Sequence, residues 1–170
     1  DDGQNFQLKH TVPNADRTQI AVSKQNAGTI YVLAEVPGGV AMQSTTDGFA
    51  ADISDLDLPN DADNGIDAND FTRGQAFYDL TIAVDPTNDA IVYIGGIDIH
   101  RSTNSGSSWQ TISKWSSGYS TGVSVVHADQ HAMVFRPGNS NQAILGHDGG
   151  VSFASSLSTA PNSTSAIQTR

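Results

Sequence analysis

The sequence has no cysteine, few basic residues and no long apolar run. Without cysteine, its 170 residues can form neither disulfide bonds nor thiolate sites. Only 8 lysines and arginines stand against 18 aspartates and glutamates, and the formal net charge of −10 argues against nucleic acid or an anionic membrane as a partner. No stretch reaches the roughly 18–20 apolar residues that cross a bilayer. No signal segment opens the chain, so we expect residues 1–3 to be a mature or excised end.

The segment 82–109 indicates what kind of fold is present. It contains three short runs rich in β-branched or aromatic residues, 82–84, 91–94 and 97–102, which are separated by Pro, Asn, Asp and Gly. This pattern predicts strands joined by tight turns. No window of comparable length has a 3.6-residue apolar period, so the segment is predicted to be an antiparallel meander.

The meander ends in an octet that matches the pattern Ser-x-Asp-x-Gly-x-x-Trp. Ser102, Asn104, Gly106 and Trp109 fill the defined positions, with Asn in the Asp place. A short polar side chain can bond backbone N–H groups across the turn, glycine can adopt positive φ, and the tryptophan can pack as an apolar plug. The octet resembles the Asp-box (BNR-type) repeat of β-propellers such as sialidases, sortilin-type receptors and xyloglucan-cleaving glycoside hydrolases.

The whole unit is repeated along the chain. Residues 82–84 align with residues 20–22 and with residues 133–135, and each copy is followed by a second β-type run and a Gly-containing break. We therefore predict an all-β fold of about three antiparallel four-stranded blades. The predicted boundaries are approximately 16–57 for blade 1, 77–115 for blade 2 and 127–160 for blade 3. The polar tail after Ser156 is expected to be a linker or a further strand.

Three blades do not easily close a ring, because propellers typically have about four to eight. Each blade buries one sheet face against each neighbour, so an incomplete ring leaves apolar flanks bare. We expect the rest of the propeller to lie in the same parent chain, or alternatively in another chain.

An acidic loop, residues 52–70, separates the first two copies. Asp61, Asp63 and Asp67 alternate around the turn at Gly65, and Ca²⁺ prefers six to eight oxygen ligands of this kind. The spacing does not fit an EF-hand, because three residues without carboxylates would fall on ligand positions. The alternatives are a calcium site and a solvated surface loop.

Two further segments strengthen the resemblance to propellers of large secreted bacterial proteins. These are residues 71–80 before blade 2 and the pair 126–132 and 146–151 in blade 3. The resemblance implies a secreted, bacterial location. It is specific for the fold and weak for activity, because such propellers serve as enzymes and as binding scaffolds. No segment matches the N-terminal catalytic motif of the xyloglucanases.

The first strand of each copy should line the central channel, so the residues that enter these strands should converge at one rim. Three interpretations of this rim compete. The alternation of His127, Asp129 and His131 would put these three side chains on one face of a strand, which favours a transition-metal site with Asp148 or His147 as the fourth ligand. Another interpretation is that these side chains only form hydrogen bonds with backbone groups near the propeller axis.

The remaining interpretation is that the rim catalyses hydrolysis. Asp79 and Asp129 on adjacent blades could form the carboxylate pair of a glycoside hydrolase. In a sialidase-like version Tyr78 would be the nucleophile, and Arg17 and Arg73 would bind the ligand.

Trp115 lies just outside the meander and is a candidate platform for a sugar ring. The predicted function is a scaffold or binding surface, with polysaccharide as the ligand class considered. The alternative is a glycoside hydrolase, xyloglucanase-like or sialidase-like.

Overall fold

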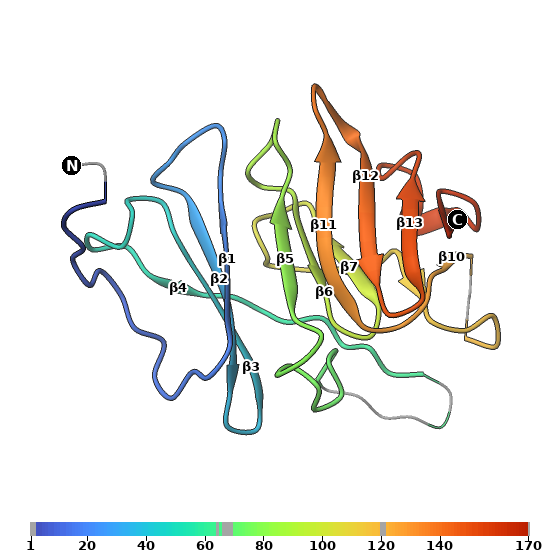
Figure 1. Cartoon of the computed structure of the whole chain (residues 1–170), viewed down its shortest axis with the longest axis horizontal. Helices are drawn as coiled ribbons and strands as arrows, with labels where there is room; N and C mark the ends of the chain where they lie inside the picture. Colours follow the sequence, from blue (N-terminus) through green and yellow to red (C-terminus); the bar gives the residue numbers. More distant parts are fainter. Residues whose placement is uncertain (1–2, 64, 66–69, 120–121, 170) are drawn as a thin grey trace.

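The computed structural model describes residues 3–63, 65, 70–119 and 122–169. Three four-stranded antiparallel sheets follow one another along the chain, and the described residues contain no α-helix (Figure 1). This confirms the predicted all-β fold of four-stranded blades. Among these residues no helix is long and apolar enough to cross a membrane.

Each blade is a meander in which neighbouring strands pair in chain order. Blade 1 contains β1 (Thr18–Val22), β2 (Ile30–Val36), β3 (Gly39–Thr45) and β4 (Ser54–Asp55). Blade 2 contains β5 (Thr81–Val84), β6 (Val92–Gly95), β7 (Ile99–Ser102) and β8 (Gln110–Thr111). Blade 3 contains β11 (Gln130–Arg136), β12 (Asn139–His147), β13 (Gly150–Ala154) and β14 (Ile167–Thr169).

The tail after Ser156 completes blade 3. A short 3-10 turn, η1 (Ala160–Asn162), leads into β14, which pairs with β13. Ala160, Ala166 and Ile167 are buried, so this low-complexity segment carries apolar residues at the positions that face the core. The blade therefore extends beyond residue 160, because one buried isoleucine fixes a strand that is otherwise polar.

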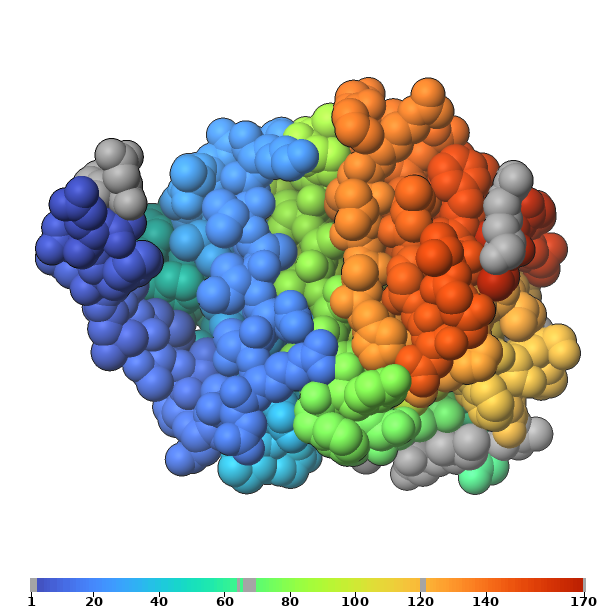
Figure 2. Space-filling view, viewed as in Figure 1, coloured from blue at the N-terminus to red at the C-terminus, as the bar shows by residue number. Residues whose placement is uncertain are grey.

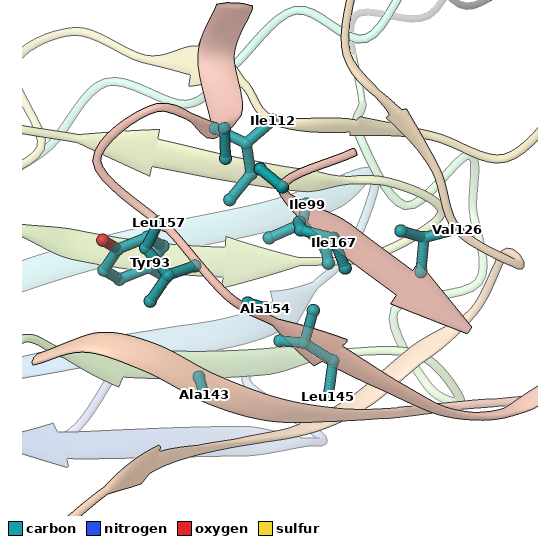
Figure 3. Packing of buried hydrophobic residues seen from close by; sticks show 11 residues of the cluster. Tyr93, Ile99, Ile112, Val126, Ala143, Leu145, Ala154, Leu157 and Ile167 are labelled. Carbon is teal, nitrogen blue, oxygen red and sulfur yellow. The ribbon is translucent and has the colours of Figure 1, made fainter. Parts of the chain in front are cut away.

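The first strands of the blades lie side by side, β1 next to β5 and β5 next to β11 (Figure 1). Two apolar clusters hold the blades together. Tyr31 and Leu33 of blade 1 pack with Val92 and Ile94 of blade 2. A second cluster joins blade 2 to blade 3 and to the tail, as Figure 3 shows for its labelled residues: Tyr93, Ile99, Ile112, Val126, Ala143, Leu145, Ala154, Leu157 and Ile167.

The octet in blade 2 forms the turn that its sequence predicts. Gly106 has φ of 87°, and its N–H donates to Ser102 Oγ at 2.9 Å. Asn104 Oδ1 accepts from the Ser108 N–H at 3.0 Å. Trp109 packs against the cluster between blades 1 and 2, and its Nε1–H donates to the Asp57 carbonyl at 2.7 Å.

Blade 1 has an equivalent turn after β3. Thr45 Oγ1 accepts from the N–H groups of Asp47 and Phe49, as Ser102 Oγ does from those of Asn104 and Gly106. Phe49 takes φ of 62°, a left-handed conformation that favours glycine. Blade 1 therefore forms the same turn although phenylalanine stands in the glycine place.

A separate pair of two-residue strands, β9 (Ser113–Lys114) and β10 (Ser124–Val125), connects blades 2 and 3. The two strands are parallel, which the predicted meander does not include. The connection between these blades therefore has a secondary structure of its own.

Candidate functional site

The inner strands β5 and β11 begin at the same end of the molecule, the lower end in Figure 1. We call this end the mouth. Asp79 and its neighbour Tyr78 come just before β5, and Asp129 comes just before β11. His131 lies in β11, and Asp148 follows β12, which ends at the mouth because it runs antiparallel to β11. These residues form the mouth cluster: Tyr78, Asp79, Asp129, His131 and Asp148.

Short hydrogen bonds join three of these side chains. The Tyr78 hydroxyl donates to Asp148 Oδ1 at 2.8 Å, and His131 Nε2 lies 2.7 Å from the same oxygen. The tyrosine and histidine rings meet edge to face, with centroids 4.9 Å apart. The two hydrogen bonds lower the pKa of Asp148, so the carboxylate is ionised at neutral pH.

Asp79 lies in a different environment within the same cluster. Its side chain is fully buried, and neither carboxylate oxygen has a hydrogen-bond partner within the described structure. Burial, and then the negative charge of Asp129, raise the pKa of Asp79 to about 7. Burial and the charge of Asp148 also raise the pKa of Asp129. The cluster therefore combines a carboxyl that holds its proton near neutral pH with an ionised carboxylate.

Arg17 holds the loop that carries Tyr78 in place. Its guanidinium donates to three backbone carbonyls, those of Phe77, Tyr78 and Leu80. These bonds tie the start of blade 1 to the loop that carries Tyr78. Part of the hydrogen-bonding capacity of Arg17, which was predicted to bind the ligand, is therefore used by the protein's own backbone.

The sialidase-like arrangement requires an activated tyrosine. The hydrogen bond that Tyr78 donates to Asp148, together with the nearby carboxylates, raises the pKa of the phenol, so the nucleophilic phenolate is disfavoured. The guanidinium of Arg73 lies away from this cluster and contacts Asp61 and Asp63. Among the described residues, the two arginines predicted to bind the ligand, Arg17 and Arg73, are thus already bonded to oxygens of the protein.

The predicted alternation of His127, Asp129 and His131 on one strand face is wrong. β11 begins only at Gln130, and Asp129 takes φ of 65°, which breaks the extended backbone. His127 instead stacks on His147, with ring centroids 6.0 Å apart, while His131 bonds Asp148. In the described residues, the ligand atoms of this set are not gathered within the 4.8 Å that a shared ion needs.

A second cluster of charges lies at the same end of blade 2, and we call it the ion cluster: Asp61, Asp63, Arg73, Asp98 and Lys114. The Lys114 ammonium nitrogen lies 2.5 Å from Asp61 Oδ1, 2.8 Å from Asp63 Oδ1 and 3.2 Å from Asp98 Oδ2. Arg73 Nη2 lies 2.5 Å from Asp63 Oδ2. Asp61 and Asp98 have fully buried side chains.

The pKa values in the ion cluster follow from burial and pairing. Burial would lower the pKa of Lys114, but its hydrogen bonds to Asp61 and Asp63 raise it. Burial and the charge of Asp61 raise the pKa of Asp98 to about 8. Burial lowers the pKa of the neighbouring His100 to about 3, so its imidazole is neutral.

This geometry bears on the calcium prediction for Asp61, Asp63 and Asp67. Asp61, Asp63 and Asp98 have ligand atoms within 4.8 Å of one another, as a metal site requires. However, Lys114 already supplies the positive charge between these carboxylates. Asp67 lies outside the described residues.

Aromatic side chains contact both clusters. Phe77 and Tyr78 are exposed at the mouth. Trp115 is partly exposed, and its Nε1–H donates to Asp63 Oδ2 at 3.1 Å, so the ion cluster orients the indole. Its ring lies 5.2 Å from that of Tyr119.

Sequence reasoning missed several residues of this region: Phe77, Asp98, His100 and Lys114. Phe77 could have been found from its position beside Tyr78 in a polar loop. Lys114 and Asp98 gave no signal, because each is a single charged residue whose partners come from a loop far away in the sequence.

The sequence matches no family model and no curated protein. Three solved structures have similar folds. A GH74 enzyme from Niastella koreensis is 21% identical, with a TM-score of 0.54 over 88% of this chain and 22% of its own. The GH74 xyloglucanase from Xanthomonas campestris is 17% identical, with a TM-score of 0.52 over 85% of this chain and 22% of its own.

The third is YCF48 bound to a D1 peptide, which is 13% identical, with a TM-score of 0.53 over 90% of this chain and 42% of its own. At these identities the similarity shows the fold alone. All three neighbours are β-propellers, and this chain is therefore propeller-like. It spans about a fifth of the two GH74 structures and about two fifths of YCF48.

Proposed function

We propose that this chain contributes three blades to a larger β-propeller of a secreted bacterial protein, and that its mouth binds polysaccharide. The proposal rests on the combination of aromatic and polar side chains at the mouth. Exposed aromatic rings of Phe77 and Tyr78 stand beside the hydrogen-bonded carboxylate of Asp148 and the imidazole of His131. Flat apolar rings combined with a few convergent polar groups are typical of small-ligand and glycan sites.

The charge of the mouth selects among polysaccharides. Asp148 is ionised, and Arg17 is bonded to backbone carbonyls. A polyanionic glycan would meet the carboxylates of the mouth, and the nearby Arg17 is already partly engaged by backbone carbonyls, so neutral polysaccharides fit best. Because two of the proteins with similar folds are GH74 enzymes, one of them a xyloglucanase, xyloglucan is the first probe. The cysteine-free composition is consistent with a secreted bacterial protein.

Isothermal titration of the chain with soluble xyloglucan and other neutral glucans tests the proposal. Phe77→Ala should weaken binding by about tenfold, because loss of an aromatic contact at a binding hot spot costs about 1–2 kcal/mol. Phe6→Ala is the matched control, since Phe6 is an exposed phenylalanine in the N-terminal segment. Equal affinities for the two variants, or no binding of any neutral glycan by the unaltered chain, would refute the mouth as the site.

Glycoside hydrolysis is a second candidate, and the pKa of Asp79 favours it. A general acid works best when its pKa lies near the operating pH, and Asp79 has a pKa of about 7 beside the carboxylate of Asp129. However, a proton donor must reach the glycosidic oxygen, and both Asp79 oxygens are buried. Hydrolysis therefore requires the loop that carries Tyr78 to open, and binding remains the primary proposal.

Reducing-end release from xyloglucan separates the two functions. If the mouth is catalytic, Asp79→Asn and Asp129→Asn should each abolish release while binding persists. If the mouth only binds, the unaltered chain releases no reducing ends, and both variants keep most of their affinity.

A further inference from the structure

A histidine and two carboxylates meet in the interior beside the ion cluster. Asp98 directly precedes β7, and His100 lies in that strand. Asp61 comes from the acidic loop, and its Oδ2 lies 4.0 Å from His100 Nε2. A carboxylate oxygen of Asp61 also lies within 4.8 Å of one of Asp98. The side chains of all three residues, which we call the buried triad, are fully buried.

Each member of the buried triad has a side-chain atom without a hydrogen-bond partner among the described residues. These atoms are Asp61 Oδ2, both carboxylate oxygens of Asp98 and His100 Nε2. Buried polar atoms in folded proteins are nearly always paired, with protein groups, water or an ion. Three neighbouring residues with unpaired buried atoms therefore point to a ligand that they share.

The two cations of the ion cluster do not satisfy these atoms. Lys114 bonds the other oxygen of Asp61, Oδ1, and lies 3.2 Å from Asp98 Oδ2. Arg73 Nη2 is 3.7 Å from Asp61 Oδ2, which is too long for a hydrogen bond. When ionised, Asp61, Asp63 and Asp98 carry one more charge than Lys114 and Arg73 balance. A proton on Asp98 could neutralise that charge but could pair with only one acceptor, whereas a metal ion contacts several ligand atoms at once.

The imidazole of His100 is held as a metal ligand would be. Its cross-strand partner on β8 is Thr111, whose Oγ1 lies 3.2 Å from His100 Nδ1. Metal-bound histidines almost always donate the N–H of their second ring nitrogen to such a partner, which leaves the lone pair of the first nitrogen for the ion. Phe71 packs edge to face against the ring, with centroids 5.9 Å apart. The ring orientation is therefore fixed from two sides.

The available donor atoms select the kind of ion. One imidazole nitrogen with carboxylate oxygens suits Zn²⁺ and similar transition metals, whereas Ca²⁺ prefers about six to eight oxygens. Asp63 does not enlarge the oxygen set, because its carboxylate is bonded by Lys114, Arg73 and Trp115.

We propose that Asp61, Asp98 and His100 bind one divalent transition-metal ion of the zinc class, which fastens the acidic loop to blade 2. Asp63, two residues after Asp61, accepts the Nε1–H of Trp115. An ion on the buried triad therefore also steadies the position of that indole. The green segment before β5 and the yellow segment after β9 both lie at the lower end of Figure 2. The ion site is independent of what the mouth binds.

Zinc binding to the chain after removal of metals with a chelator tests the site. After equilibration with ZnCl₂ and desalting, elemental analysis should find one zinc per chain, and zinc should raise the melting temperature, because it binds the folded state. Asp98→Asn and His100→Gln should each weaken zinc binding at least tenfold in competition with a chromogenic chelator. His127→Ala is the matched control, since His127 is an exposed histidine that stacks on His147 instead. Circular dichroism establishes that each variant is folded.

Nitrogen NMR of the unaltered chain gives a result that needs no variant to fold. Zinc should shift the Nε2 resonance of His100 and leave the other histidines largely unchanged. No retained zinc, which would mean that water satisfies the triad, would overturn the proposal. Zinc retained equally by Asp98→Asn, zinc lost in His127→Ala, or Ca²⁺ bound in preference to Zn²⁺ would overturn it as well. Loss of glycan binding in Phe77→Ala would leave the zinc content unchanged.

Discussion

Replacing Lys114 by methionine tests the account of the ion cluster. The ammonium group lies within 3.2 Å of carboxylate oxygens of Asp61, Asp63 and Asp98, and the side chains of Asp61 and Asp98 are fully buried. Methionine keeps most of the apolar stem and removes the charge. Because one partner of a buried ion pair is lost and the carboxylates remain, the expected cost is about 3–5 kcal/mol of unfolding free energy.

The melting temperature should fall accordingly. For a domain of this size about 1 kcal/mol corresponds to about 2–4 °C, so the loss should be on the order of 6–20 °C. Calorimetry and urea unfolding measure it. Lys24→Met is the matched control: Lys24 is exposed, and such surface changes are usually within about 0.5 kcal/mol.

The pH dependence of the Lys114→Met loss gives the refuting result. Without the ammonium group, the pKa values of Asp61 and Asp98 in the folded state should rise further. A raised folded pKa means that these groups contribute most at low pH and lose that contribution as pH rises through the folded pKa. The variant should therefore recover part of its stability at pH 5. A loss below about 1 kcal/mol, or one equal at pH 5 and pH 8, would refute the buried ion cluster.

Two further changes probe the mouth and the octet. The folded pKa of Asp79, about 7, lies above its ordinary 3.8, so its contribution to stability is full below about pH 4 and is lost as pH rises through 7. Asp79→Asn should therefore gain stability relative to the unaltered chain as pH rises from 4 to 8 in urea titrations; a constant difference would contradict this. Asn104→Ala loses its bonds to Ser108 and should cost about 1 kcal/mol in urea unfolding, whereas Ser107→Ala should cost almost nothing; equal losses would contradict the role of the octet.

Much of the fold could be predicted because the chain repeats itself. The alignment of residues 20–22, 82–84 and 133–135 places all three segments in inner strands, and the structure has them in β1, β5 and β11. The same repeat brings the residues before β5 and β11 to one end. That is why Tyr78, Asp79 and Asp129 could be expected near one another before their distances were known.

Other features of the structure could not be predicted from local sequence patterns. The alternation from His127 to His131 predicted one strand face, but Asp129 adopts a left-handed conformation, and the next residue, Gln130, donates its N–H to the Gly96 carbonyl of blade 2. The polar tail gave a weak strand signal, yet β14 forms because Ile167 reaches an apolar cluster. In both cases contacts with distant residues outweigh the local preference of the backbone.

The sequence by itself determined the period of the structure. Alternating β-type runs, turn residues and the octet recur along the chain, and local backbone preferences are sufficient to specify strands and turns of that spacing. The tertiary structure decided which charges are buried and which are free. Lys114 and Asp61 lie 53 positions apart in the sequence, and their partnership depends on how the loop folds against blade 2. Desolvation and pairing act through space, so the pKa values of Asp79 and Asp98 follow from neighbours that no sequence spacing identifies.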